Sequence, residues 1–263
     1  MTLFVSTPTY RTPPKLLRRS VASVLASDVE DVRVIVVNDG GPELRELPKD
    51  SRLLVFKLPV NRGRYFADAV VTTALENRPD DYYVPLDSDD WVEPEHYRRL
   101  LECDETGFVM SPYFRHRHNG SPFLQEPSRA RLRNPDGNFV HLGHWCSGMY
   151  RISRVTSAGG MHPGFRVGFD TLFTLMLAMT GPVTICESPG YHWQRRKSDS
   201  LTTARETRFG SSHRAEAKKK LVALHAQAWS ERARDSGAVI RRDVDQKLAG
   251  EVREHSQRLR ELL

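Results

Sequence analysis

The chain has 263 residues, of which 39 % are hydrophobic and 27 % are charged, and it carries a formal net charge of +6. This composition is typical of a globular protein with a sizeable core and excludes a disordered or low-complexity chain. No apolar run reaches the length of about 18 residues that marks a membrane-spanning helix.

The basic charge and the cysteines indicate which partners and which cellular compartment to expect. No known nucleic-acid-binding motif is present, so we expect the excess of arginine to serve a phosphate-bearing substrate and no nucleic-acid partner. Cys103, Cys146 and Cys186 are odd in number and widely spaced, which predicts reduced thiols and argues against a zinc cluster. The first residues predict a strand and not a signal peptide. We therefore expect a cytoplasmic protein, with peripheral contact at the inner membrane face as an alternative.

The first hundred residues alternate between strand and helix patterns. Apolar runs predict strands, and apolar residues three or four apart predict helices, at residues 3–6, 13–25, 32–37, 53–58, 65–75 and 82–86. Strands separated by helices form βαβ units, so the expected fold class is α/β with a mostly parallel central sheet. Ligands bind beyond the carboxyl ends of such strands, where Asp39 and Asp87–Asp90 fall.

The second half of the chain has a different pattern. Short strands are expected at 108–113, 122–124, 139–142, 183–186 and 191–193, with an apolar helix at 168–179. Beyond about residue 210 the chain becomes polar and helical. The residues with the spacing of a short coiled-coil seam are Leu248, Val252, His255, Leu259 and Leu262. We expect this tail to lie outside the sheet and to form a homodimer or contact an anionic surface through Lys218–Lys220; packing on its own domain is the alternative.

The most informative motif is Asp87-Ser88-Asp89-Asp90, which follows a strand of apolar residues. Three carboxylates at such a place are costly to desolvate unless a cation or hydrogen-bond donors compensate them. Hard oxygen ligands suit Mg²⁺ or Mn²⁺ bridging a diphosphate. A solvated acidic turn, or a helix cap at Asp90, is the alternative.

The order of motifs resembles that of the family 2 glycosyltransferases, which have the GT-A fold. The matching segments are Val5–Tyr10, Ser20–Leu25, Val36–Gly41, Asn61–Gly63, Leu86–Asp90, Gly168–Asp170 and Arg195–Thr202. The resemblance implies a catalytic domain at 1–205, with a nucleotide-sugar-binding half (1–105) and an acceptor-binding half (106–205), followed by a helical extension (206–263). Asn38 replaces an aspartate of the family but can still donate and accept hydrogen bonds. Phe169 replaces a glutamate and so removes a carboxylate near the acceptor, and acceptor handling is therefore expected to differ.

The resemblance also implies a reaction. It is an inverting transfer of a sugar from a nucleotide diphosphate, with a UDP-sugar expected, to a hydroxyl of a saccharide, a lipid-linked molecule or a small natural product. Asp170 would be the general base, with a helix cap as its alternative role. Asp89 would hold Mn²⁺ or Mg²⁺, assisted by Asp87 or Asp90. Asp39 would accept a hydrogen bond from uracil, and an Asx-turn at this residue is compatible with that role.

Other residues receive roles from the same resemblance. The further nucleotide-binding candidates are Thr7, Pro8, Tyr10, Arg62, Arg64, Asp87 and Ser88. The basic loop would bind the diphosphate through Arg195, Arg196, Lys197 and Ser198. His192, just before it, is a metal or phosphate candidate, and His144 and Trp145 are acceptor candidates because Trp faces stack on sugars. Packing is the alternative for both His-Trp pairs.

Three alternative functions stay open: a retaining GT-A glycosyltransferase, a sugar-nucleotide nucleotidyltransferase and a non-catalytic nucleotide-sugar-binding protein. A nucleotidyltransferase usually has a glycine-rich basic loop after its first strand, and residues 6–14 contain no glycine. The intact aspartate cluster and Asp170 argue against a non-catalytic protein.

Overall fold

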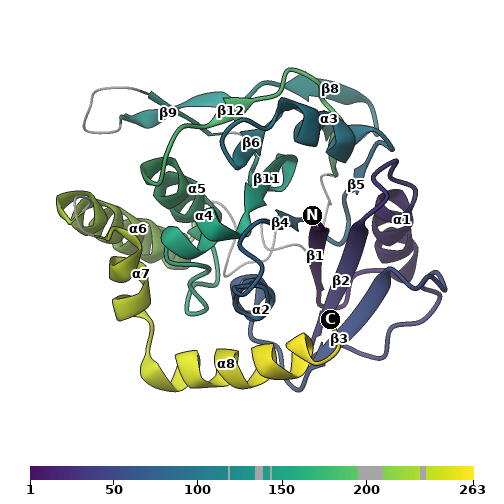
Figure 1. Ribbon diagram of the computed structural model, residues 1–263, viewed down its shortest axis with the longest axis horizontal. Helices are drawn as coiled ribbons and strands as arrows, with labels where there is room; N and C mark the ends of the chain where they lie inside the picture. Colours follow the sequence, from purple (N-terminus) through teal and green to yellow (C-terminus); the bar gives the residue numbers. More distant parts are fainter. Residues whose placement is uncertain (118, 134–138, 143, 195–209, 232–234) are drawn as a thin grey trace.

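A seven-stranded sheet forms the centre of the protein in the computed structural model, which describes residues 1–117, 119–133, 139–142, 144–194, 210–231 and 235–263. The strand order is β12-β6-β11-β4-β1-β2-β3 (Figure 1). The strands are β1 (Leu3–Thr9), β2 (Val32–Asp39), β3 (Leu53–Leu58), β4 (Tyr82–Pro85), β6 (Phe108–Met110), β11 (Gly148–Arg151) and β12 (Thr184–Ile185). The expected α/β class is therefore confirmed.

The parallel half of the sheet comprises β1 to β4 and carries the acidic motifs. β1, β2 and β4 are almost continuous buried runs, as expected for parallel strands covered on both faces, whereas the edge strand β3 is buried only at Phe56 and Leu58. The helices α1 (Pro14–Leu25) and α2 (Arg64–Ala74) cover opposite faces (Figure 1). Because β1 lies between β2 and β4, Asp39 and Asp87 end up one strand apart at the carboxyl edge of the sheet.

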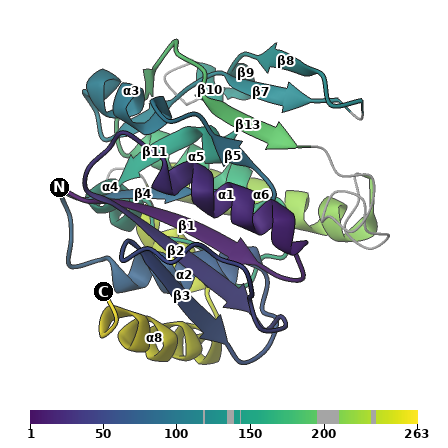
Figure 2. The same ribbon diagram turned by 90° about the vertical axis from the view of Figure 1, so that its right-hand side faces the viewer.

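A smaller four-stranded sheet in the order β5-β13-β7-β8 adjoins the acidic turn. Figure 2 shows its β7, β8 and β13 at the opposite end of the molecule from α8. Its strands are β5 (Trp91–Val92), β7 (Tyr113–His116), β8 (Pro122–Gln125) and β13 (Tyr191–Gln194). Pairing of His192 with Trp91 places β13 directly beside the residues that follow Asp90.

The remaining elements before the tail support these two sheets. They are α3 (His96–Cys103), β9 (Ser128–Arg133), β10 (Phe139–Leu142), the short helix η1 (Trp145–Ser147), α4 (Ile152–Ser157) and α5 (Phe169–Met179). The sequence analysis did not predict α3, α4, β9 or β11. It did predict α5, whose strongly apolar sequence reflects burial on nearly every side.

The tail is helical and shares the core of the protein. Its helices are α6 (Ser212–Ser230), α7 (Gly237–Asp243) and α8 (Gln246–Arg260). Its apolar side chains Leu221, Ile240, Val252 and Leu259 are buried in the same cluster as the central sheet. The seam residues of α8 therefore face the domain itself. The predicted boundaries at residues 105 and 205 and the homodimer stay predictions.

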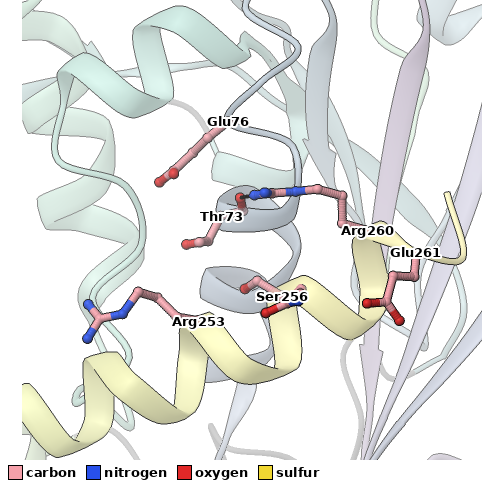
Figure 3. Close-up of a pocket in the computed structure, with 7 residues that line it drawn as sticks. Thr73, Glu76, Arg253, Ser256, Arg260 and Glu261 are labelled. Carbon is pink, nitrogen blue, oxygen red and sulfur yellow. Dashed lines mark hydrogen bonds between the residues drawn. The ribbon is translucent and has the colours of Figure 1, made fainter.

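Helix α8 also caps the end of α2. Arg260 Nη2 donates to the carbonyl of Thr73 (2.9 Å) (Figure 3), and its Nε donates to the carbonyl of Ala74 (3.2 Å). One turn earlier, the Ser256 hydroxyl donates to the carbonyl of Val70 (3.0 Å). A polar pocket lies between the two helices, and its lining residues are Thr73, Glu76, Arg253, Ser256, Gln257, Arg260 and Glu261. The carbonyls of Thr73 and Ala74, two of the last in α2, thus accept from a side chain of the tail.

Two leucines of the predicted coiled-coil seam distinguish packing within the domain from dimer formation. Leu259 is fully buried, whereas Leu262 is 57 % exposed. We expect Leu259→Ala to lower the free energy of unfolding by about 2–5 kcal/mol and Leu262→Ala to change it by less than about 0.5 kcal/mol. Urea denaturation at two protein concentrations measures both. Equal effects that grow on dilution would instead indicate a seam between two chains.

The cysteines differ from the expectation. Cys103 and Cys186 form a disulfide, with their Cα atoms 5.7 Å apart, and Cys146 is buried and free. The prediction of three reduced thiols is therefore wrong for two of them. The pairing had no local sequence signal, because the two cysteines are 83 positions apart and only the fold brings the end of α3 beside β12.

No helix among the described residues has both the length and the apolar character needed to cross a membrane.

Candidate active site

Four consecutive residues at the beginning of α2, Arg62–Tyr65, contact three carboxylates that lie far apart in the sequence. The carboxylates are those of Asp39 at the end of β2, Asp87 after β4 and Asp170 in the first turn of α5. The first N–H groups of a helix lack partners within the helix and favour negative charge. The beginning of α2 therefore gathers acidic groups at the carboxyl edge of the sheet.

The carboxylate of Asp39 is buried and has three hydrogen-bond donors. The backbone N–H groups of Arg62 and Gly63 donate to it at 2.7 Å each, and Asn61 Nδ2 donates at 2.9 Å. Burial raises the pKa of Asp39, although the two backbone donors oppose this shift. The adjoining turn is closed by Asn38, whose Oδ1 accepts from the N–H of Gly41 (2.8 Å). The side chain of Asp39 is therefore not needed for the turn.

Arg64 links two carboxylates below this turn. Its Nε donates to Asp68 (3.1 Å), which is fully buried and also accepts from the hydroxyl of Ser6 (2.8 Å). Its Nη1 forms an ion pair with Asp87. The guanidinium lies 4.4 Å from the ring centre of Trp145. Arg64, predicted to bind nucleotide, thus holds Asp87 in place, and buried Asp68 fixes Arg64.

Asp170 lies on the same side of the molecule. It is partly exposed, and its Oδ1 accepts from the hydroxyl of Tyr65 at 3.1 Å. The residue before α5, Gly168, adopts a left-handed conformation (φ 80°) that favours glycine. No side chain caps α5, so Asp170 does not perform the alternative capping role.

The turn that carries Ser88 and Asp89 is held by polar contacts to its surroundings. The hydroxyls of Thr12 and Ser88 lie 2.6 Å apart. Arg19 Nη2 donates to the backbone carbonyl of Asp89 (2.6 Å) and to the side chain of Gln194 (2.5 Å). The Arg19 guanidinium also stacks 3.7 Å from the ring centre of Trp91. Asp89 itself is partly exposed.

Asp90 does not occupy a ligand-binding position. It is 1 % exposed, and it accepts from the hydroxyl of Tyr191 and from the N–H of Gln194 (2.7 Å). Burial, with the charge of Asp89, raises its pKa well above the ordinary value. Its predicted role as an assisting metal ligand is therefore corrected: Asp90 fastens β13 to the acidic turn.

His192 is likewise not brought to the aspartates. Its ring is stacked between those of Trp91 and Phe114, with distances between ring centres of 4.8 Å and 4.9 Å. Its Nδ1 lies 3.0 Å from the Nε2 of His116, and its Nε2 lies 3.3 Å from a carboxylate oxygen of Glu93. Because protein groups occupy both nitrogens, the packing alternative holds and the predicted metal role does not.

The candidates at the end of β1 differ in exposure. Thr7 and Pro8 are buried within the strand, and the Thr7 hydroxyl has no hydrogen-bond partner among the described residues. Tyr10 follows the strand and is 44 % exposed, with the guanidinium of Arg11 5.1 Å from its ring centre. Of the three, Tyr10 is the one with an open side chain.

Arg62 is engaged elsewhere by its side chain. Its guanidinium forms an ion pair with Glu251 of α8 and lies 5.8 Å from the ring centre of Phe66. Its backbone N–H therefore makes the direct contact with Asp39, and the charge of its side chain opposes the rise that burial causes in the pKa of Asp39.

Both acceptor candidates pack against aromatic side chains. Trp145 is 5 % exposed and is surrounded by Arg64, Tyr65 and Phe173, so it presents no open face to a sugar. His144 stacks on Tyr191 (5.3 Å), and burial lowers its pKa to about 3. The expectation that Trp145 contacts the acceptor is corrected, because its neighbours leave only 5 % of it exposed. His144 packs on Tyr191 but is partly exposed, so its acceptor role stays a prediction.

The basic loop candidates Arg195, Arg196, Lys197 and Ser198 lie outside the described residues. Within the described part of the chain, no three His, Cys, Asp or Glu side chains are grouped so that they could hold a metal ion. Mg²⁺ in nucleotide enzymes commonly uses one or two carboxylates and completes its shell with substrate phosphates and water. The oxygen donors of Asp89 and Asp87 fit that pattern.

Sequence reasoning missed the residues that position these carboxylates, namely Arg19, Tyr65, Asp68 and Tyr191. Arg64 and Asp68 are four residues apart on a helix, a spacing at which opposite charges pair, so this contact had a signal. The contacts of Tyr65 with Asp170 and of Tyr191 with Asp90 span more than 100 residues and had none.

Comparison with protein-family models and known proteins gives consistent matches. The model described as "Glycosyl transferase family 2" matches residues 4–199. Succinoglycan biosynthesis protein ExoW of Rhizobium meliloti (strain 1021) is 37 % identical over 103 residues, covering 36 % of this chain and 31 % of that protein. Putative glycosyltransferase EpsH of Bacillus subtilis (strain 168) is 27 % identical over 105 residues, covering 37 % and 29 %. The chain thus spans less than a third of either curated relative.

Two solved structures show the same GT-A fold. S. aureus TarS 1–349 in complex with UDP-GlcNAc matches with a TM-score of 0.60 at 16 % identity, over 78 % of this chain and 61 % of that one. GalNAc-T7 with UDP, GalNAc and Mn²⁺ matches with a TM-score of 0.61 at 13 % identity, over 97 % and 55 %. At these identities the likeness concerns the fold alone.

Proposed function

The chain belongs to glycosyl transferase family 2, and we propose that it transfers a sugar from a UDP-sugar to an acceptor hydroxyl, using a divalent cation and inverting the anomeric carbon. The observation that carries the proposal is the convergence of Asp39, Asp87 and Asp170 on the beginning of α2. In this proposal Asp39 serves the nucleobase of the donor, Asp87 serves its diphosphate, and Asp170 takes the proton of the acceptor.

The proposed donor follows from the chemistry at the end of β2. A carboxylate oriented by three donors keeps a lone pair with which to accept the N3–H of uracil. The solved complexes of TarS with UDP-GlcNAc and of GalNAc-T7 with UDP support a uridine nucleotide. The exposed ring of Tyr10 is the proposed neighbour of the nucleoside.

A cation is proposed at the acidic turn. Asp89, together with Asp87, would hold Mn²⁺ or Mg²⁺, and the bound ion would neutralise the diphosphate as it leaves. Arg19 holds the backbone at Asp89, and Arg64 holds the carboxylate of Asp87, before the donor arrives. Pre-orientation of this kind lowers the reorganisation needed during the reaction.

Asp170 is the proposed general base. Its partial exposure gives an acceptor access, and the bond from Tyr65 occupies one lone pair of the carboxylate and leaves others for the acceptor proton. In an inverting transfer the acceptor oxygen attacks the anomeric carbon while the nucleoside diphosphate departs, so one base suffices. Asp170 would take the acceptor proton during this attack.

Release of UDP from a panel of UDP-sugars in the presence of Mn²⁺ tests this function, with GDP- and dTDP-sugars of the same configuration as matched controls. We expect release from a UDP-sugar, loss of release when a chelator removes the metal, and faster release with a suitable acceptor. Proton NMR of the first product should show the opposite anomeric configuration. Preference for a GDP-sugar would contradict the donor assignment, and a retained configuration would contradict the role of Asp170.

A further inference from the structure

The side chain of Arg166, which has no role in the proposed reaction, lies over the turn around Asp39. Arg166 is exposed and belongs to the loop between α4 and α5, four residues before Asp170. Its Nη2 donates to Asn61 Oδ1 at 3.4 Å. The guanidinium also covers Gly63, because a Cβ built on that glycine would meet Arg166 Nη1 at 2.8 Å. Gly63, with φ +93°, thus provides the space for this close approach.

The guanidinium is therefore next to the buried carboxylate of Asp39. Its positive charge opposes the rise that burial causes in the pKa of Asp39. Among the described residues Arg166 forms no ion pair with an acidic side chain, and its hydrogen bond goes to the neutral side chain of Asn61. An arginine has five N–H donors, so most of them remain available to a ligand.

Three of the four lone-pair positions of the Asp39 carboxylate are used by the donors described above. Asn61 and Gly63 donate to Oδ2 and Arg62 donates to Oδ1, so the open position is on Oδ1. A nucleobase that donates there would lie against the turn 61–63, which Arg166 covers. The pairing edge of uracil has a carbonyl oxygen on each side of N3–H. Its order of acceptor, donor and acceptor matches a carboxylate flanked by a cationic donor.

We propose that Arg166 is a specificity-determining residue for the nucleobase, donating a hydrogen bond to a uracil carbonyl oxygen while Asp39 accepts from N3–H. This inference rests on the proposed function and names a contact within it. Cytosine meets the same pair with a bare nitrogen acceptor facing the carboxylate and, on one side, an amino donor in place of a carbonyl. Two mismatched contacts in one site discriminate more strongly than a difference in shape does.

Calorimetric titration of UDP and CDP in the presence of Mn²⁺ tests the proposal with wild type, Arg166→Ala and Arg166→Lys. The matched control is Arg33→Ala, which removes an exposed arginine at the other end of β2. We expect Arg166→Ala to weaken UDP binding roughly tenfold to a hundredfold, to change CDP binding much less, and so to reduce the preference for UDP. Arg166→Lys should recover part of that preference, and Arg33→Ala should keep all of it.

Equal weakening of UDP and CDP by Arg166→Ala would overturn the proposal, because it would mean that the guanidinium only supports the turn or attracts the diphosphate. Unchanged binding of both would overturn it as well. In either case wild-type binding of UDP with Mn²⁺ leaves the proposed function standing. If the wild type binds neither nucleotide, the proposed function fails and this inference fails with it.

Discussion

Replacing Asp170 with asparagine is expected to leave UDP binding unchanged and to lower the transfer rate by about 10³-fold, within the range that general bases contribute. Asparagine keeps the size of the side chain and an oxygen that can accept from the Tyr65 hydroxyl, which lies 3.1 Å from Oδ1 of Asp170 in the wild type. It cannot take the acceptor proton. Steady-state turnover and calorimetry on the same preparation measure the two quantities. Asp80→Asn, on an exposed turn, is a matched control that should change neither.

Tyr65→Phe distinguishes the proton-accepting role of Asp170 from the orientation that the Tyr65 hydroxyl gives its carboxylate. Removal of the hydroxyl leaves the Asp170 carboxylate in place without its donor, so we expect a smaller fall in turnover than for Asp170→Asn. Normal turnover in Asp170→Asn would exclude Asp170 as the base. A parallel loss of UDP binding would show that this residue belongs to the donor site instead.

The second large effect is expected for Asp89→Ala, which should abolish metal-dependent turnover while the protein stays folded. The side chain is partly exposed, and Arg19 holds the turn through the backbone carbonyl of Asp89, which the substitution keeps. Turnover as a function of Mn²⁺ concentration, together with the thermal unfolding midpoint, measures both parts.

Asp90→Ala provides the contrast within the same motif. Its loss leaves the buried Tyr191 hydroxyl and the N–H of Gln194 without their acceptor, which costs about 1–3 kcal/mol for each such group. We therefore expect Asp90→Ala to lower the unfolding midpoint and Asp89→Ala to leave it nearly unchanged. Full activity in Asp89→Ala would remove the metal assignment.

The parallel half of the fold could be predicted because local sequence determines it. Buried β-branched runs such as Val32–Val37 form strands in almost any context, and the helices between them follow from apolar spacing. Asp39 and the acidic turn were predicted at one edge because parallel strands all end there. Membership of glycosyl transferase family 2, expected from the order of these motifs, is confirmed by the family match.

The partners of the site residues could not be predicted in the same way. Whether a site residue is free to bind a ligand depends on side chains from distant segments. Asp90 accepts a hydrogen bond from Tyr191, and Arg62 forms an ion pair with Glu251 in the tail. The sequence around Asp90 is as acidic as that around Asp89. Only the position of β13 separates their roles, because β13 covers Asp90.

The same limit applies to the tail. The spacing of Val252 and Leu259 shows that α8 has an apolar stripe but not which surface covers it. In the structure α2 covers it, and the contact of Ser256 with Val70 fixes the register of the two helices.

Titration of UDP into the protein with and without Mn²⁺ is the most direct test of a metal-dependent nucleotide-sugar site at the beginning of α2. We expect saturable binding of one UDP per chain in the presence of Mn²⁺ and weak binding of GDP under both conditions. In a chelator, UDP should bind at least tenfold more weakly, which is roughly 1.4 kcal/mol. Binding of UDP with the same affinity in Mn²⁺ and in chelator, or no binding in either, would contradict this expectation.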